Sequence, residues 1–236
     1  HEILVKEINY KNKKNTTTRN KNGEISQLDN DTIKYSNTVF DDNAYIDYDT
    51  KNIDIGDSLM TILSTKGCPF TCSFCANHTL YGTKMVYRPD CVVKTDLEKA
   101  LSFPTTRKLI LAEPNATIPT KKHKKHFKEL LQMMVDAGFK KEKHQALIFV
   151  KPSYTDDDYF EMLGEYSDRL NYLVFPGIEN FNNEALKNLG KKETKESLFE
   201  FYDKVIKNPA GITSVLGYII FGHPLDSESL LQENLE

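Results

Sequence analysis

The sequence predicts an α/β fold in which parallel strands and helices alternate from residue 58 onward. Five short runs are almost continuously apolar, as strands buried on both faces are, and segments with a helical period separate them. The runs occupy 59–63, 108–112, 146–150, 172–175 and 214–220. Parallel strands joined by helical crossovers form a barrel or an open doubly wound sheet, and both fold types bind ligands at the carboxyl ends of the strands.

Helices are expected in every gap between these runs, over 93–103, 121–137, 156–166, 183–189 and 195–206. In the second helix, apolar residues recur at spacings of three and four and form a stripe that packs on a sheet. The stripe consists of Phe127, Leu130, Leu131 and Met134. The same helix opens with the basic run 121–126, which includes His123 and His126, and we interpret this run as a solvated face.

Residues 1–57 differ from the rest of the chain, because Asn, Lys, Thr and Asp dominate and apolar pairs are few. This composition predicts a solvated lead-in or linker. Two runs of strand formers, 2–10 and 22–25, are separated by turn residues and could pair as a small hairpin. We therefore divide the chain into a linker, 1–57, and a core domain, 58–236.

The composition argues against membrane and nucleic-acid partners. The 236 residues include 28% charged side chains and carry a net charge of −3, so the whole molecule presents no positive field for phosphates. No apolar run approaches the roughly 18 residues of a membrane-spanning helix. The first ten residues lack the pattern of a secretory signal, and we expect a cytoplasmic protein.

Three of the four cysteines fall within eight residues, directly after the first apolar run. Four cysteines are too few for a disulfide scaffold in a chain of this length. A loop this short can wrap Cys68, Cys72 and Cys75 around one iron–sulfur cube and leave one iron open for a ligand. The alternative is a closed zinc site with His78 or Cys91 as fourth ligand. Otherwise we expect Cys91 to be a small buried side chain.

Polar residues and glycines also follow the other four runs. Because the carboxyl ends of parallel strands meet at one edge of a sheet, these residues are expected to share a single pocket with the cysteines. They are Glu113 with Asn115, Lys151 with Ser153, Gly177 with Glu179, and Gly222 with His223.

The cysteine motif carries a family resemblance. A Cys-x3-Cys-x2-Cys run with Phe74 before its last cysteine, placed after the first strand of a βα repeat, resembles the radical S-adenosylmethionine (SAM) enzymes. Further stretches match in order, at 85–90, 176–180, 186–191 and 217–224. The stretches after the fourth run, within 176–191, and at the end of the fifth run, 217–224, resemble the subgroup that often carries an N-terminal cobalamin-binding domain. The lead-in is similar to the linker between the two domains of that subgroup. The resemblance covers nearly the whole chain and implies a partial (β/α) barrel.

The resemblance also implies a chemistry. Cys68, Cys72 and Cys75 would bind a [4Fe-4S] cluster whose open iron holds SAM. One-electron reduction then cleaves SAM to a 5′-deoxyadenosyl radical, which abstracts hydrogen from a small-molecule or peptide substrate. An electron donor such as ferredoxin or flavodoxin is the implied partner. For the cobalamin subgroup, the implied cofactor is cobalamin bound by a domain outside this chain.

The same resemblance assigns roles to the residues after the strands, with Glu113 and Lys151 as catalytic residues. Glu113 and Asn115 would contact the methionyl amine or the substrate, and Lys151 the methionyl carboxylate. The remaining implied contacts are Ser153 to the ribose, Gly177 and Glu179 to the adenosine, Phe74 or Tyr81 over the adenine, and, more weakly, Asn77 to the cofactor.

Each assignment has a structural alternative. Glu113 and Lys151 could pair with each other across neighbouring strand ends. Ser153 could be a turn residue or a helix cap, and Glu179 could hold a loop.

Two features depart from the family. Only residues 225–236 follow Pro224, so we expect a barrel truncated after its fifth strand, and His223 is expected to be structural. With only Cys91 left over, a second cysteine-bound cluster within this segment is not expected. Three functions therefore stay open. The favoured one is a radical SAM enzyme that performs cobalamin-assisted methyl transfer. The others are a radical SAM enzyme without cobalamin and a non-catalytic zinc or iron–sulfur protein.

Overall fold

The computed structural model describes residues 18–19, 25–26, 58–223, 225–228 and 232. The chain divides into two compact units, 1–38 and 39–236. In the first, β1 (Thr18–Arg19) pairs antiparallel with β2 (Ile25–Ser26). The hairpin predicted between 2–10 and 22–25 lies outside the described residues except for Ile25, which pairs with Arg19 and not with a residue of 2–10. The boundary at residue 57 stays a prediction.

The second unit is built on a five-stranded sheet in the order β3-β6-β7-β8-β9, and every neighbouring pair is parallel. Strand order follows chain order, as expected for repeated βα units. The strands are β3 (Ser58–Ile62), β6 (Thr106–Leu111), β7 (Gln145–Val150), β8 (Tyr172–Pro176) and β9 (Ile212–Val215). The predicted α/β class is confirmed. A separate antiparallel pair, β4 (Thr65–Lys66) and β5 (Val86–Tyr87), brackets the cysteine loop in the sequence.

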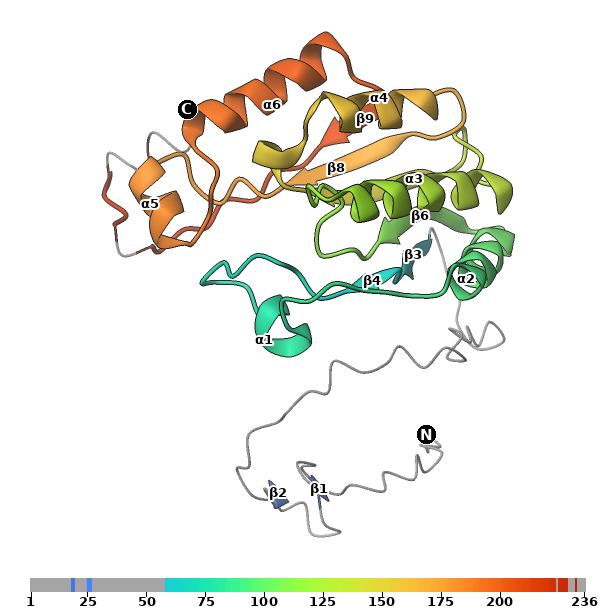
Figure 1. The fold of residues 1–236 in the computed structure, drawn as a ribbon, viewed down its shortest axis with the longest axis horizontal. Helices are drawn as coiled ribbons and strands as arrows, with labels where there is room; N and C mark the ends of the chain where they lie inside the picture. The colour runs from blue at the N-terminus through green and yellow to red at the C-terminus, as the bar shows by residue number, and fades with distance from the viewer. Residues whose placement is uncertain (1–17, 20–24, 27–57, 224, 229–231, 233–236) are drawn as a thin grey trace. The chain divides into compact units, whose positions relative to one another are not determined.

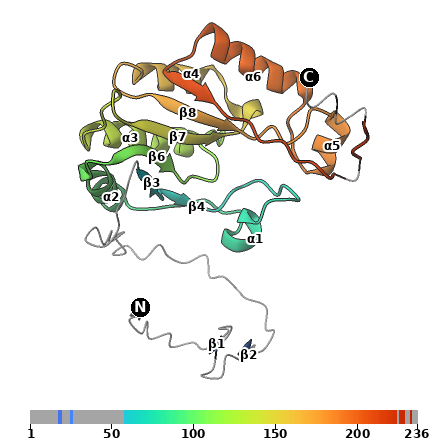
Figure 2. The ribbon, with the colours of Figure 1, turned by 180° about the vertical axis from the view of Figure 1, so that it is seen from behind.

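Helices cover one face of this sheet (Figure 1). Seen from behind, β6, β7 and β8 lie in front of the helices, and their other face has no helical layer (Figure 2). The covering helices are α2 (Asp90–Ser102), α3 (Lys121–Asp136), α4 (Asp157–Glu165) and α6 (Lys195–Lys207). Three short elements follow strands: α1 (Asn77–Tyr81), the 3-10 turn η1 (Pro152–Tyr154) and α5 (Asn183–Asn188). None of the helices in the described residues combines the length and apolarity needed to cross a membrane.

The two faces of the sheet carry different apolar clusters, because successive strand residues point to opposite sides. In β7, Ala146 and Ile148 belong to the main core under the helices, which also contains the predicted stripe of α3. Leu147 and Phe149 belong to a second cluster on the opposite face. That cluster is completed by Ile110, Leu173 and Phe175. The face without helices thus carries aromatic side chains near the carboxyl ends of the strands.

The last strand is shorter than the run 214–220 predicts. β9 ends at Val215, and the following residues pair with the loop after β8 instead: the N–H of Glu179 donates to Tyr218 O at 2.8 Å, and the N–H of Ile220 donates to Glu179 O at 2.8 Å. Gly217 permits this path, since a Cβ there would lie 2.1 Å from Ile178 Cδ1.

Candidate functional site

The cysteine loop begins at a glycine that no other residue could replace without strain. Gly67 has φ +81°, and a Cβ on it would lie 2.2 Å from the carbonyl oxygen of Lys84. The N–H of Cys68 then donates to Gly82 O at 3.2 Å, and the N–H of Cys75 donates to Cys72 O at 3.0 Å. A bond from Ser73 N to Leu189 O, at 3.0 Å, ties the loop to the end of α5. The backbone therefore holds the loop at the carboxyl end of the sheet.

The three clustered cysteines are free thiols that line one pocket of about 180 Å³. Burial raises the pKa of Cys68 and of Cys72, while the positive charge of Lys151 lowers it in both. The charges of Cys72 and Cys75 raise the pKa of Cys68 further, so the sulfurs affect one another electrostatically. Within the described part of the chain, no group of three or more His, Cys, Asp or Glu side chains is arranged to hold a metal ion as it stands.

Cys91 does not belong to this group. It is exposed near the start of α2 and does not line the pocket, so the expectation that it is buried is wrong. Val92 and Val93, the next residues of α2, take the buried positions of that turn.

The pocket also contains most of the residues predicted from the strand ends. It is lined by Phe74, Asn77, Asn115, Lys151, Gly177 and Glu179 together with the cysteines. Ser153 does not line it, and neither does Glu113.

Lys151 is buried and has a carboxylate partner that the sequence did not reveal. Its Nζ lies 2.6 Å from Glu193 Oε2 and 4.8 Å from the centre of the Phe70 ring. The hydroxyl of Ser153 donates to Glu193 Oε1 at 3.0 Å. The alternative pairing of Lys151 with Glu113 is wrong, because Glu193 occupies that place. Glu193 belongs to a run of charged residues after α5, and such a run is typical of a solvated surface. Only its tertiary contact with Lys151 identifies Glu193 as a residue of the site.

Ser153 lies in the 3-10 turn η1, as the turn alternative predicted, and it is not the cap of the next helix. Asp156 caps α4, since its side chain accepts a hydrogen bond from the N–H of Tyr159.

Glu179 both lines the pocket and holds a loop. Its backbone has φ +65°, and its Oε1 lies 3.4 Å from Lys191 Nζ. The same ammonium donates to the carbonyl of Gly177 at 2.6 Å and lies 3.9 Å from Glu193 Oε2. A Cβ on Gly177 would approach Lys191 Nζ to 2.7 Å, so a side chain at this position would displace the end of Lys191. Lys191 thus joins the loop after β8 to the Lys151–Glu193 pair.

Asn115 presents its amide N–H groups to the pocket. The resemblance implies instead a contact with an amine, which would need the amide oxygen. Its Oδ1 accepts from both the N–H and the hydroxyl of Thr117, at 2.9 Å each. A backbone N–H can only donate, so the atom facing Thr117 is the oxygen. The Nδ2 group is buried and has no partner among the described residues. Asn115 therefore suits an acceptor such as a carboxylate.

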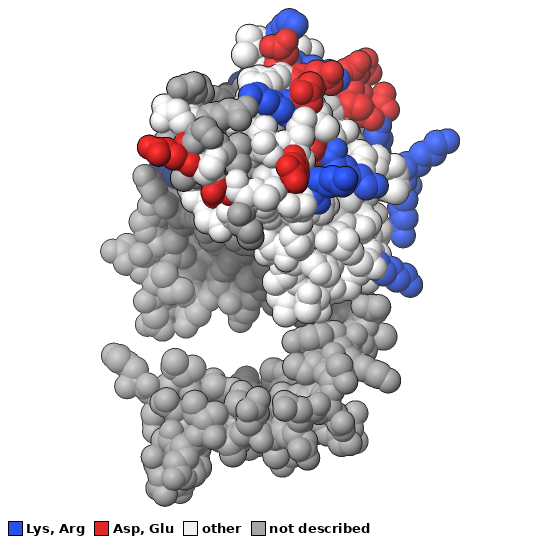
Figure 3. Space-filling model, turned by 90° about the vertical axis from the view of Figure 1, so that its left-hand side faces the viewer, with Lys and Arg blue, Asp and Glu red and all other residues white. Residues whose placement is uncertain are grey.

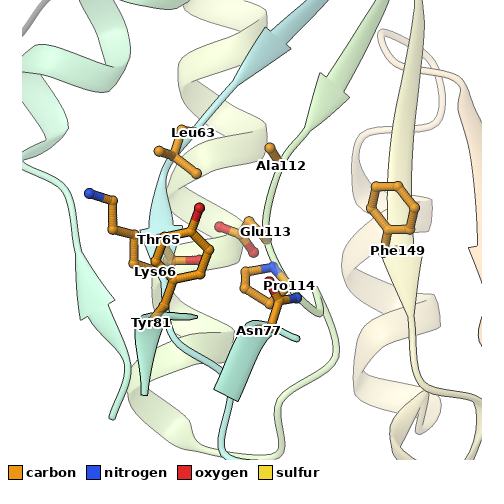
Figure 4. Close-up of a pocket in the computed structure, with 9 residues that line it drawn as sticks. All are labelled: Leu63, Thr65, Lys66, Asn77, Tyr81, Ala112, Glu113, Pro114 and Phe149. Carbon is orange, nitrogen blue, oxygen red and sulfur yellow. The ribbon is translucent and has the colours of Figure 1, made fainter. Parts of the chain in front are cut away.

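A second, larger cavity of about 340 Å³ contains Glu113 (Figure 4). Of the two aromatic residues that the resemblance implies over the adenine, Tyr81 lines this larger cavity and Phe74 lines the cysteine pocket. Asn77, Pro114 and Phe149 line both spaces, so the two cavities adjoin. The polar residues expected in a single pocket are thus divided between two neighbouring ones.

Two buried histidines hold Glu113, and the interpretation of 121–126 as a solvated face is wrong for them. His126 Nε2 lies 2.9 Å from Glu113 Oε1, and His123 Nε2 lies 3.5 Å from Oε2. The Ser64 hydroxyl also donates to Oε1. Burial lowers the pKa of His123, although the charge of Glu113 opposes this effect. Both histidines continue the apolar stripe of α3 at helical spacing, and this spacing is the signal that could have revealed them.

His223 takes part in a local turn. Its Nδ1 accepts from the N–H of Leu225 at 3.1 Å, and its own N–H donates to Asp226 Oδ2 at 2.9 Å. These contacts agree with the predicted structural role.

Figure 3 views the end of the molecule where α5 and the chain after β9 lie in Figure 1. A broad area of uncharged side chains occupies the middle of this face, and acidic and basic side chains border it above and to the right.

Comparison with known proteins gives relatives that are methyltransferases. No family model matches the chain. It is 29% identical over 176 residues to the bacteriochlorophyllide d C-12(1)-methyltransferase of Chlorobaculum tepidum, with 74% of this chain and 36% of that protein covered. It is 28% identical over 180 residues to an uncharacterised methyltransferase of Synechocystis, with 73% of this chain and 31% of that protein covered. The chain spans about a third of the length of these curated relatives.

Solved structures with a similar fold are radical SAM enzymes. The cobalamin-dependent SAM radical enzyme OxsB, with aqua-cobalamin bound, superposes with a TM-score of 0.62 at 14% identity, over 93% of this chain and 31% of that chain. The radical SAM methyltransferase TsrM from Kitasatospora setae, with tryptophan and a SAM analogue bound, superposes with a TM-score of 0.59 at 19% identity, over 75% of this chain and 33% of that chain. These superpositions confirm the predicted fold class, and they show that the resemblance to the radical SAM enzymes holds for the fold.

Proposed function

We propose that this chain is the cluster- and SAM-binding part of a radical SAM methyltransferase that works with cobalamin. The observation that carries the proposal is the pocket at the carboxyl ends of the strands, where three free cysteines and a buried lysine come together. The methyltransferase relatives and the cobalamin-dependent fold neighbours support the reaction and the second cofactor. Cobalamin would be bound by a domain outside this chain. The electron donor and the cytoplasmic location stay predictions from the sequence.

The donors present fit a [4Fe-4S] cluster. Thiolates are the usual soft ligands of such clusters, and a loop can adjust to bring them together. A four-iron cube is larger than a single ion, so its cysteine sulfurs lie farther apart than the ligands of one zinc. Cys68, Cys72 and Cys75 line a common pocket, so the three sulfurs would bind the same cluster. Cys91, the proposed fourth zinc ligand, is exposed and does not line that pocket. When bound, the cluster would supply the electron that cleaves the sulfonium of SAM.

The chain itself would bind and orient SAM. The buried Nδ2 of Asn115, which lacks a partner in the described residues, would donate to the methionyl carboxylate. Lys151 would add its positive charge near the same group, and Glu193, at 2.6 Å, would hold the ammonium in place as a positioning residue. Gly177 leaves room for the adenosine because no side chain stands there. Phe74 would cover the adenine.

Aromatic side chains would keep water away from this site. Phe149 stacks on Phe175 with ring centres 5.1 Å apart, and Phe175 stacks on Tyr218 at 5.7 Å. All three line the cysteine pocket. An apolar wall of this kind protects a reactive radical from solvent.

Anaerobic reconstitution with iron and sulfide tests the proposal. The wild-type chain should bind about four irons, and its reduced form should give an electron paramagnetic resonance signal that changes when SAM is added. Cys72→Ala should lose the iron, whereas the matched change Cys91→Ala should keep it. Tightly bound zinc, or full iron content in Cys72→Ala, would contradict the proposal.

A further inference from the structure

The cysteine loop has an outer side that the proposed function does not use. Its three cysteines line the pocket, whereas Pro69, Thr71 and Ser73, which lie between them in the sequence, are exposed. Cys72 and Cys75 are themselves only half-buried. The sulfur ligands proposed for the cluster are therefore covered on this side by a single loop.

The end of α5 packs against the same loop. Ser73 donates its N–H to Leu189 O at 3.0 Å and its hydroxyl to Asn188 O at 3.4 Å. Gly190 follows with φ +70°, and a Cβ on it would lie 3.3 Å from Thr71 O. The cysteine loop and the end of α5 therefore form one continuous surface.

This surface is basic, although the chain as a whole is acidic. The net charge of the chain is −3, and 34 of its 236 residues are Asp or Glu. The segments 58–89, which contains the cysteine loop, and 185–192, at the end of α5, contain neither. Their basic residues are Lys66, Lys84, Arg88, Lys187, Lys191 and Lys192. Such a local excess of positive charge attracts an anionic partner.

Three of these basic residues are exposed, namely Lys84, Lys187 and Lys192. In the part of the chain that the structure describes, none of the three forms an ion pair, whereas Lys191 is held by Glu179. The backbone of Lys84 touches the start of the cysteine loop. Lys187 and Lys192 enclose the stretch 188–191, whose backbone meets the loop on the other side. The three ammonium groups therefore surround the loop and are available to a partner.

The chemistry of the proposed cluster indicates which partner this is. The cluster must receive an electron before it can cleave SAM, and Cys91 alone is too little to build a second cysteine-bound cluster within this sequence. The electron therefore comes from another molecule. Proteins that exchange electrons meet through small, transient interfaces, and complementary charge speeds their encounter.

We propose that the surface formed by the cysteine loop and the end of α5 docks an acidic protein that carries one electron, and that Lys84, Lys187 and Lys192 meet its carboxylates. One electron passes from the reduced carrier to the cluster. The carrier is oxidised and the cluster is reduced by that one electron, and no bond forms or breaks. The inference rests on the proposed function, because the electron is needed only where a cluster is bound.

Reduction of the reconstituted chain by flavodoxin tests the inference. Flavodoxin hydroquinone, an acidic one-electron carrier, is mixed with the cluster-loaded protein, and its oxidation to the semiquinone is followed by stopped-flow absorbance. The second-order rate constant should fall steeply with added salt. The triple variant Lys84→Glu, Lys187→Glu, Lys192→Glu should lower this rate constant at least tenfold at low salt. Reduction by photoreduced 5-deazariboflavin, which is small and uncharged, should stay unchanged.

A matched triple variant separates this surface from the net charge. Lys94, Lys140 and Lys207 are also exposed, and the last two precede β7 and β9 at the opposite edge of the sheet. Changing these three to Glu alters the net charge equally and should slow flavodoxin far less. Changing the three docking lysines to Gln removes their charge without reversing it and should give an intermediate rate.

Three results would overturn the inference. The first is equal slowing of flavodoxin by the two Glu variants, which would assign the effect to net charge. The second is equal slowing with both reductants, which would assign it to the cluster. The third is an unchanged flavodoxin rate in a docking variant that keeps its full iron content.

Binding of oxidised flavodoxin, measured by calorimetry, distinguishes this inference from the proposed function. The chain should bind flavodoxin even before reconstitution, and the docking Glu variant should bind it at least tenfold more weakly. Such binding in a chain that assembles no cluster would refute the proposed function and leave the docking surface standing. A chain that assembles the cluster but binds flavodoxin no better than the variant would refute this inference alone. Tighter binding of a single-stranded RNA oligonucleotide through the same lysines would also overturn it.

Discussion

Removing one partner of the buried Lys151–Glu193 pair should strongly destabilise the cysteine pocket. The side chains are 7% and 0% exposed, and Nζ lies 2.6 Å from Oε2. At an effective dielectric constant of about 20, opposite charges at that distance attract by about 6 kcal/mol. Desolvation of the two ions offsets much of this attraction, so the net worth of the pair is small. Removing one partner, however, leaves the other charge buried and costs about 3 kcal/mol.

We therefore expect Glu193→Gln to lower the free energy of unfolding by about 3 kcal/mol. It leaves the Lys151 ammonium beneath Phe70 without its carboxylate, while Lys191 keeps its bonds to Gly177 and Glu179. Lys151→Met should cost less, because Glu193 keeps the Ser153 hydroxyl at 3.0 Å and the Lys191 ammonium at 3.9 Å. The double variant should be much more stable than the sum of the two single changes predicts, because no lone charge remains.

Urea unfolding followed by circular dichroism measures these values under anaerobic conditions, with Glu200→Gln on α6 as the surface control. Additive losses in the double variant, or a loss below about 0.5 kcal/mol in Glu193→Gln, would refute the reasoning.

Three other changes test the surrounding structure. Gly67→Ala should destabilise the cysteine loop and prevent iron uptake, because its Cβ would meet Lys84 O at 2.2 Å; normal iron content would contradict this. Asp96→Asn should lower the free energy of unfolding by about 3 kcal/mol, since Arg88 would lose its buried ionic partner; an unchanged urea midpoint would refute it. Burial lowers the pKa of His144 to about 4, so its contribution to stability is present above pH 6.5 and is lost as the pH falls from 6.5 towards 4. His144→Gln should flatten the stability profile between pH 7 and pH 5, and an identical slope in both proteins would argue against this role.

Local patterns predicted most of the elements. Short apolar runs and stripes at spacings of three and four depend on neighbours in the chain, and the strands and helices accordingly formed close to the expected ranges. The exception is 214–220, where a continuous apolar run leaves the sheet after Val215. The cause is tertiary, because the loop after β8 offers Glu179 as a pairing partner.

The histidines of α3 show how a composition rule can mislead. Four lysines in 121–126 indicated a solvated face, and the lysines Lys121, Lys122 and Lys125 are indeed exposed. His123 and His126 lie on the other side of the same turn, at 0% and 6% exposure. Helical periodicity, applied to polar residues as well as to apolar ones, distinguishes the two sides.

The sequence by itself determined the alternation of strands and helices, the cysteine spacing and the set of polar residues that follow the strands, because these depend on periodicity and on position along the chain. Only the tertiary structure decided which of those residues meet. It placed Glu193 on Lys151, brought two histidines to Glu113 and divided the expected single pocket into two. Lys151 and Glu193 are 42 residues apart in the sequence and meet only when the sheet and helices have packed, so no local pattern encodes this pairing.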